Sequence, residues 1–65
     1  MTDTQRRIIL TLSDGDWREL FPQFSISGII SAMRAGYARQ DASGAIIGAR
    51  FTLTPKGEQA YRWMQ

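Results

Sequence analysis

The chain has 65 residues, enough for one small domain whose hydrophobic core only just offsets the loss of chain entropy. It has no cysteine, which excludes disulfides and thiolate metal sites, and no histidine, the usual general base and metal ligand, so we expect no catalytic residue, metal or cofactor. The net charge of +2 is uneven: residues 1–27 hold three basic and four acidic side chains and residues 28–65 five and two, which favours a polyanionic partner on the C-terminal part.

The first residues, MTDTQRR, lack the apolar run of a signal peptide, and no apolar stretch approaches the ~20 residues that cross a bilayer. We therefore expect a cytoplasmic protein without membrane contact. Thr2 or Thr4 is a candidate N-cap for a first helix that ends near Leu12. Ile8, Ile9 and Leu12 would form its buried stripe.

A second helix is predicted to begin at Asp16, an N-cap residue followed three positions later by Glu19, which can complete a capping box. Apolar residues follow at helical spacing: Trp17, Leu20, Phe21 and Phe24. Because Pro22 disfavours helical geometry at the residue before it, this helix should have only two turns, with Phe24 filling the gap before the next helix. The short junction predicts a sharp angle between the two helices, as in a helix-turn-helix.

The stretch from Ser25 to Gly36 predicts a third helix, with serine as its N-cap and glycine in the left-handed position that ends it. The face predicted to be buried carries Ile26, Ile29, Ile30 and Met33. The face predicted to point outward carries Ser27, Gly28, Ser31 and Arg34. The small residues of this helix, Gly28, Ala32 and Ala35, would allow a close approach either to a ligand or to another helix.

Two extended runs, Tyr37–Gln40 and Ala45–Leu53, flank the turn sequence Asp41-Ala42-Ser43-Gly44 and predict a β-hairpin. Pairing of Gln40 with Ala45 places Arg39 opposite Ile46 and puts both on one face with Arg50. The opposite, core face would carry Ile47, Ala49, Phe51 and Leu53. Ile46 would then be exposed, which makes it a candidate contact for a second subunit in a homodimer.

A last helix is predicted from the N-cap Thr54 and Pro55, whose missing amide proton costs nothing in the first helical position, to near Gln65. Its buried stripe would contain Ala60, Tyr61 and Met64. We interpret Trp17 and Trp63 as aromatic residues at the edge of the core, since each accompanies other apolar residues in a predicted helix.

The order helix, helix, helix, hairpin, helix resembles a winged helix-turn-helix domain, which makes residues 1–65 a single, mainly α domain with a β-hairpin. The most specific part is GYARQDASGAIIGARFTLTPKGEQAYRWM. It is similar to winged-helix regulators in which a glycine ends the recognition helix, an aromatic residue opens the wing, an arginine follows, and L-T-x-K-G-x-x-A begins the last helix. Gly36, Tyr37, Arg39 and residues 53–60 match these features. The first short strand of that family has no clear candidate in the sequence.

The resemblance implies binding of double-stranded DNA, with helix 25–36 in the major groove and the wing, residues 37–53, on the backbone or minor groove. Serine hydroxyls and small residues would lie near phosphates or base edges, and Arg34 would be the only long charged reader. The expected DNA-binding residues are Ser25, Ser27, Gly28, Ser31, Arg34, Arg39, Arg50 and Lys56. Because so few groups can read bases, a homodimer or a role beside another protein is expected.

The leading hypothesis is therefore a transcriptional regulator or accessory factor that binds DNA, of the kind that suits a phage, plasmid or other mobile element. The alternative is a winged helix used only for binding protein, as an adaptor or an inhibitor of a host complex. The modest charge and the small residues of helix 25–36 fit this alternative, and each arginine taken singly could be a solvated surface charge.

Overall fold

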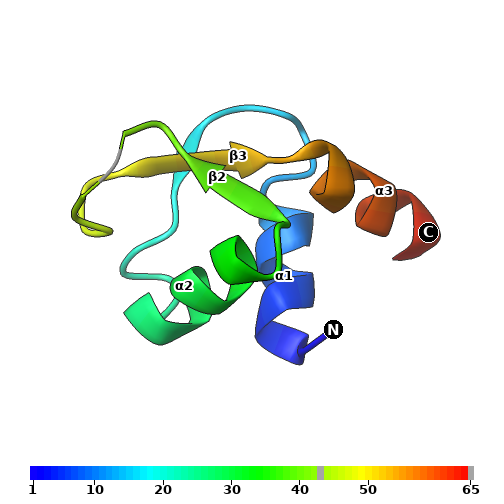
Figure 1. Cartoon of the computed structure of the whole chain (residues 1–65), viewed down its shortest axis with the longest axis horizontal. Coiled ribbons are helices and arrows are strands. Elements are labelled where there is room, and N and C mark those ends of the chain that lie inside the picture. Colours follow the sequence, from blue (N-terminus) through cyan, green and yellow to red (C-terminus); the bar gives the residue numbers. More distant parts are fainter. Residues whose placement is uncertain (43, 65) are drawn as a thin grey trace.

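The structure is a computed structural model that describes residues 1–42 and 44–64. In this part of the chain, three helices and a three-stranded antiparallel sheet form a small α+β domain (Figure 1). The elements are α1 (Asp3–Thr11), β1 (Arg18–Glu19), α2 (Ile26–Arg34), β2 (Ala38–Gln40), β3 (Arg50–Leu53) and α3 (Pro55–Met64). The sheet lies over α1 and α2, and α3 extends to one side (Figure 1).

Helix α1 begins as the sequence predicts. The Thr2 Oγ1 accepts a hydrogen bond from the Gln5 amide at 3.1 Å, and the Gln5 Oε1 accepts one from the Thr2 amide at 3.0 Å. This reciprocal capping box satisfies amides that the first turn leaves without helical partners. Ile8, Ile9 and Leu12 are fully buried, which confirms the predicted stripe.

The predicted second helix is wrong. Its residues Arg18 and Glu19 form strand β1, which pairs with β3, and the chain then turns through residues 21–24. A helix begun at Asp16 and ended before Pro22 would form too few hydrogen bonds to offset the cost of its nucleation. Pairing with the open edge of β3 instead satisfies backbone groups of both strands. Phe24 is buried before α2, as predicted, although no helix precedes it.

The sheet has the strand order β1-β3-β2. Arg39 lies opposite Thr52, not Ile46, so the hairpin register is displaced by six residues from the predicted one. Because side chains alternate with a period of two, an even displacement leaves the faces unchanged. Phe51 therefore faces the core, and Arg39 and Arg50 share the outer face, as predicted.

Residues 41–49 form a loop in place of the predicted longer strand, and the predicted turn includes Ser43, which lies outside the described residues. Gly48 has a positive φ of 83°, and the Ala49 amide donates to the Ile46 carbonyl at 3.3 Å, so the chain turns where a strand was expected. Ile46 consequently packs against the core and Ile47 is 59% exposed, the reverse of the prediction. The reason for assigning Ile46 to a subunit contact is thereby removed.

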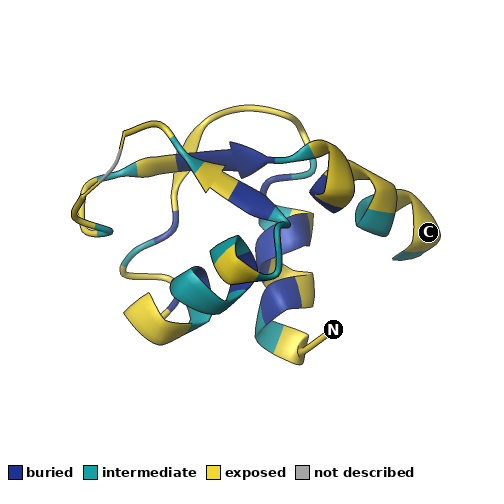
Figure 2. Ribbon diagram, viewed as in Figure 1, coloured by how far each residue is buried: buried dark blue, intermediate teal, exposed yellow. Residues whose placement is uncertain are grey.

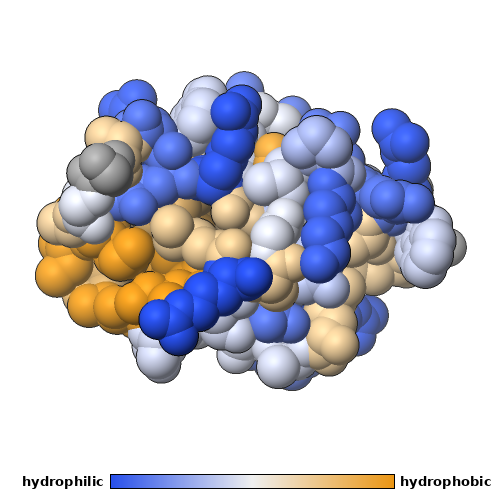
Figure 3. Space-filling model, in the orientation of Figure 1, coloured by the Kyte–Doolittle hydropathy of each residue, from blue (hydrophilic) through white to orange (hydrophobic). Residues whose placement is uncertain are grey.

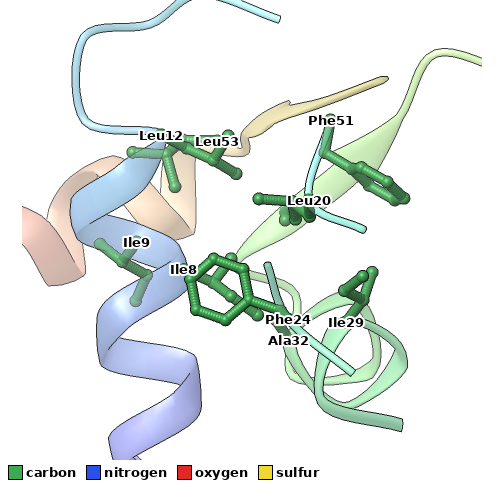
Figure 4. Close-up of a cluster of buried hydrophobic side chains, with 10 residues drawn as sticks. Ile8, Ile9, Leu12, Leu20, Phe24, Ile29, Ala32, Phe51 and Leu53 are labelled. Carbon is green, nitrogen blue, oxygen red and sulfur yellow. The ribbon is translucent and has the colours of Figure 1, made fainter. Parts of the chain in front are cut away.

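The core lies between α1, α2 and the inner face of the sheet (Figures 2 and 4). Figure 4 shows side chains of α1 facing others from the sheet, α2 and the turn that precedes α2. The core residues are Ile8, Ile9, Leu12, Leu20, Phe24, Ile29, Ala32, Ala38, Phe51 and Leu53. No helix of the described residues is long and apolar enough to cross a bilayer.

The N-terminal end of α3 lies beside the C-terminal end of α2 in space. The Thr54 Oγ1 accepts a hydrogen bond from the Gly57 amide at 3.0 Å and donates one to the Gly36 carbonyl, so one hydroxyl caps α3 and holds the end of α2. Gly36 has the predicted left-handed conformation, with a φ of 84°. Helix α3 extends to Met64. Its predicted end near Gln65 lies outside the described residues.

Candidate nucleic-acid interface

Helix α2 is held by its predicted N-cap: the Ser25 Oγ accepts a hydrogen bond from the Gly28 amide at 3.1 Å. Its buried face is rotated from the predicted one, because Ile29 and Ala32 are fully buried whereas Ile26 is 40% exposed. Ile30 and Met33 are half-buried. The outward side of α2 therefore carries Ile26, Ser27, Ile30 and Arg34.

The small residues of α2 mainly serve its packing against α1. A Cβ at Gly28 would lie 2.7 Å from the Thr4 Cγ2, so the predicted outward position of Gly28 is wrong. The Gln5 Nε2 donates to the Ser31 Oγ at 2.9 Å, and Ser31 is half-buried. Gly28 therefore allows close packing of α2 against α1. The sequence had left this role open as an alternative to contact with a ligand.

Two predicted serine contacts keep an exposed position at the start of α2. Ser25 and Ser27 are exposed, and their hydroxyl oxygens lie 3.3 Å apart. Further along the helix, Ser27, Ile30 and Arg34 line a shallow surface hollow, together with Ser31, Ala35 and Gln5 of α1. The outward face of α2 thus combines one guanidinium group with hydroxyl and aliphatic groups.

The arginines of β2 and β3 lie on the outer face of the sheet. Arg39 and Arg50 are both exposed, and the guanidinium carbon of Arg39 lies 5.4 Å from the centre of the Trp17 ring. Trp17 is 42% exposed and belongs to this outer surface, so its predicted place at the core edge is wrong. The same correction applies to Trp63, which is 81% exposed on α3.

The basic residues differ in whether they have acidic partners. Arg7 pairs with Asp3 at 3.0 Å, and Arg18 pairs with Asp14, both in the N-terminal part of the chain. Across residues 1–42 and 44–64, by contrast, no carboxylate forms an ion pair with the predicted DNA-binding cations Arg34, Arg39, Arg50 and Lys56. Glu19 lies opposite Arg50 in the β1–β3 register but forms no ion pair with it, so no salt bridge within the described chain holds these four charged groups.

The ion pair between Asp14 and Arg18 can be tested through the pKa of the Asp14 carboxyl. The hydrogen bond from the Arg18 guanidinium, helped by one from the Asp16 amide at 3.1 Å, holds the pKa of the Asp14 carboxyl below its ordinary 3.8. The stabilisation is thus fully present above about pH 3.8 and is lost as the pH falls through the lower pKa of the folded state. We expect Arg18→Ala to raise the pKa of Asp14 toward 3.8 in an NMR titration of its carboxyl carbon, and Arg7→Ala to leave it unchanged. An unaltered Asp14 pKa in Arg18→Ala would contradict the pairing.

Lys56 has a role within the fold. Its Nζ donates to the Ala35 carbonyl at 2.6 Å and lies 5.1 Å from the centre of the Tyr37 ring. The ammonium group thereby satisfies a carbonyl at the C-terminal end of α2, where the helix dipole favours positive charge. Because an ammonium group has three donors, Lys56 can still contact a phosphate from this position.

Figure 3 shows strongly hydrophilic side chains over β2, α2 and the start of α3 on the viewed face, beside a continuous hydrophobic area over α2 and the loop between β2 and β3. In these two elements Ile26 and Ile47 are exposed, and Ile30 and Ile46 are half-buried. Sequence reasoning missed this area because it assigned three of the four isoleucines to the core. The small residues Gly28 and Ala32 were the available signal, since they mark the side of α2 that packs closely.

The structure therefore places Ser27 and Arg34 on one outward face of α2, and Arg39 and Arg50 on one exposed sheet face, whereas Ser25 lines a different hollow together with residues of α1. It turns the half-buried Gly28 toward Thr4 of α1, and the hydroxyl of Ser31 accepts a hydrogen bond from Gln5. Comparisons of the chain with protein-family models, curated proteins and solved structures find no match.

Proposed function

We propose that this chain is a small double-stranded-DNA-binding protein of the winged-helix kind, acting as a transcriptional regulator or accessory factor. The order of elements supports the proposal, because β1 lies on the edge of β3 before α2, where a winged helix has its first short strand. The turn at residues 21–24 would take the place of the second helix. In this arrangement α2 enters the major groove and the β2–β3 hairpin acts as the wing.

The observation that carries the proposal is the set of exposed cations without acidic partners on α2, β2 and β3. Arg34 comes from the helix, and Arg39 and Arg50 come from the wing. DNA presents a phosphate about every 3.4 Å along each strand, which would supply ion-pair partners for these guanidinium groups. The guanidinium groups of Arg7 and Arg18 already have carboxylate partners within the fold, so we expect them to contribute less to such contacts.

A salt titration of binding to a mixed-sequence duplex tests the proposal. We expect affinity to fall steeply as salt rises, because each phosphate contact contributes about −0.9 to the slope of log K against log salt. Replacing Arg39 and Arg50 together with alanine should weaken binding to every sequence and reduce the slope by about 1.8. The matched control replaces Arg6 and Arg7, which are exposed on α1, and should change the slope little. Equal losses in both double variants would show that net charge alone governs the binding.

A module that binds only protein is the second candidate, and the hydrophobic area over α2 and the β2–β3 loop favours it (Figure 3). Contiguous apolar patches on a small protein often mark sites of interaction. The salt titration separates the two candidates, since a protein-only module would bind no duplex at low salt.

A further inference from the structure

The outward face of α2 has few polar groups free to read bases. The hydroxyl of Ser25 caps the helix, and the hydroxyl of Ser31 accepts a hydrogen bond from Gln5. The side chains that face outward are Ile26, Ser27, Ile30 and Arg34. Any discrimination between base pairs by this face must therefore come from one guanidinium group, one hydroxyl and two aliphatic side chains.

The two isoleucines are spaced to follow a DNA groove. Ile26 and Ile30 are one helical turn apart, which corresponds to ~6 Å along the axis, and successive bases of one strand rise ~3.4 Å each. The pair could thus reach neighbouring base pairs of one groove. Of the groups that the bases present in the major groove, the C5-methyl of thymine is the apolar one.

We propose, on the basis of the DNA-binding function proposed above, that Ile26 and Ile30 contact thymine methyl groups and give the chain a preference for thymine-containing duplexes. Charge supports DNA as the occupant of this face, because Arg34 lines the same hollow as Ile30 and has no acidic partner in the described chain. A second copy docked face to face would bring two such guanidinium groups together. DNA supplies both the methyl groups and the phosphates that this face can bind.

The test compares two A·T-rich duplexes of identical sequence at low salt, one with thymine and the other with deoxyuridine, which lacks only the methyl group. We expect the thymine duplex to bind about fourfold more tightly for each methyl contact, and about fifteenfold for two, the ratio that burial of one such carbon implies. Fluorescence anisotropy with either duplex as the labelled probe measures the ratio directly. The protein is unchanged between the two measurements, so the comparison does not depend on folding.

Two single substitutions test which residues cause the preference for thymine. Ile26→Ala changes a side chain that is already 40% exposed, and it should lower the thymine-to-uracil ratio about fourfold while the chain stays folded by circular dichroism. Arg39→Ala is the matched control, because loss of a phosphate contact should weaken binding to both duplexes and leave the ratio unchanged. Wild-type protein that binds both duplexes equally would overturn the thymine contact and leave the DNA-binding function standing. Absence of binding to either duplex at low salt would overturn both.

Discussion

Gly57→Ala is expected to lower the free energy of unfolding by about 3 kcal/mol, as overpacking in a rigid contact does. A Cβ at this position would overlap the Tyr37 carbonyl oxygen and lie 2.9 Å from the Leu53 Cδ2. The carbonyl is held in place because it accepts a hydrogen bond from the Thr54 amide at 3.1 Å, so α3 would have to move. The gain of about 1 kcal/mol that alanine normally brings to a helix cannot offset this overlap.

Thermal and urea unfolding followed by circular dichroism measure the effect. For a domain of this size, each 1 kcal/mol corresponds to roughly 4–8 °C in the midpoint, so Gly57→Ala should melt well below the wild type. Gln59→Ala is the control, because Gln59 is exposed in the same helix. A Gly57→Ala protein as stable as the control would show that α3 does not pack this closely on the chain after α2.

Phe51→Ala should destabilise the chain by about 4 kcal/mol, most of the stability expected of a domain this small. Phe51 is fully buried on the middle strand of the sheet, where its backbone pairs with Arg18 on one side and Gln40 on the other. Removal of the ring would leave a cavity between the sheet and the two helices beneath it, and such cavities collapse only in part. The variant is expected to be largely unfolded at 37 °C.

Ile47→Ala is the matched control for this prediction, since it also shortens an apolar residue of the predicted hairpin. Ile47 is 59% exposed, so its truncation should change stability by no more than about 0.5 kcal/mol. The sequence places both residues on the same core face, whereas the structure separates them. Similar losses from the two variants, measured by urea unfolding, would support the longer hairpin and contradict the observed register.

Local sequence signals predict the beginnings of the helices well. Thr2, Ser25 and Thr54 are all N-caps with the expected hydrogen bonds, because capping depends on residues within three positions of each other. The left-handed glycine at the end of α2 is confirmed for the same reason. These three starts can be read from neighbouring residues, but the N-cap predicted at Asp16 begins no helix, so a capping sequence alone does not establish one.

The errors arise where contacts distant in sequence decide the structure. Residues Arg18 and Glu19 become a strand because the edge of β3, more than thirty residues away, offers backbone partners. The hairpin register depends on the turn at Gly48, which competes with a run of residues that has the composition of a strand. Neither preference can be derived from windows of a few residues.

In the candidate site, too, features set by local pattern were predicted and features set by distant contacts were not. Exposure of Arg39 and Arg50 follows from strand alternation, which an even shift in register leaves intact. The rotation of α2 was not predicted, because α1 selects the side with Gly28 for close packing and turns Ile26 outward. Periodicity alone favours burial of the bulkier side, and only the position of the neighbouring helix reverses that choice.

The junction between α2 and α3 has a mechanical consequence. Lys56 holds the carbonyl of Ala35, Thr54 holds that of Gly36, and Gly57 lies directly against the chain at Tyr37. A change in the angle between the two helices would break all three contacts at once, so α2 and α3 should move together as one rigid unit. A protein fused to the end of α3 would consequently be held at a fixed orientation relative to α2.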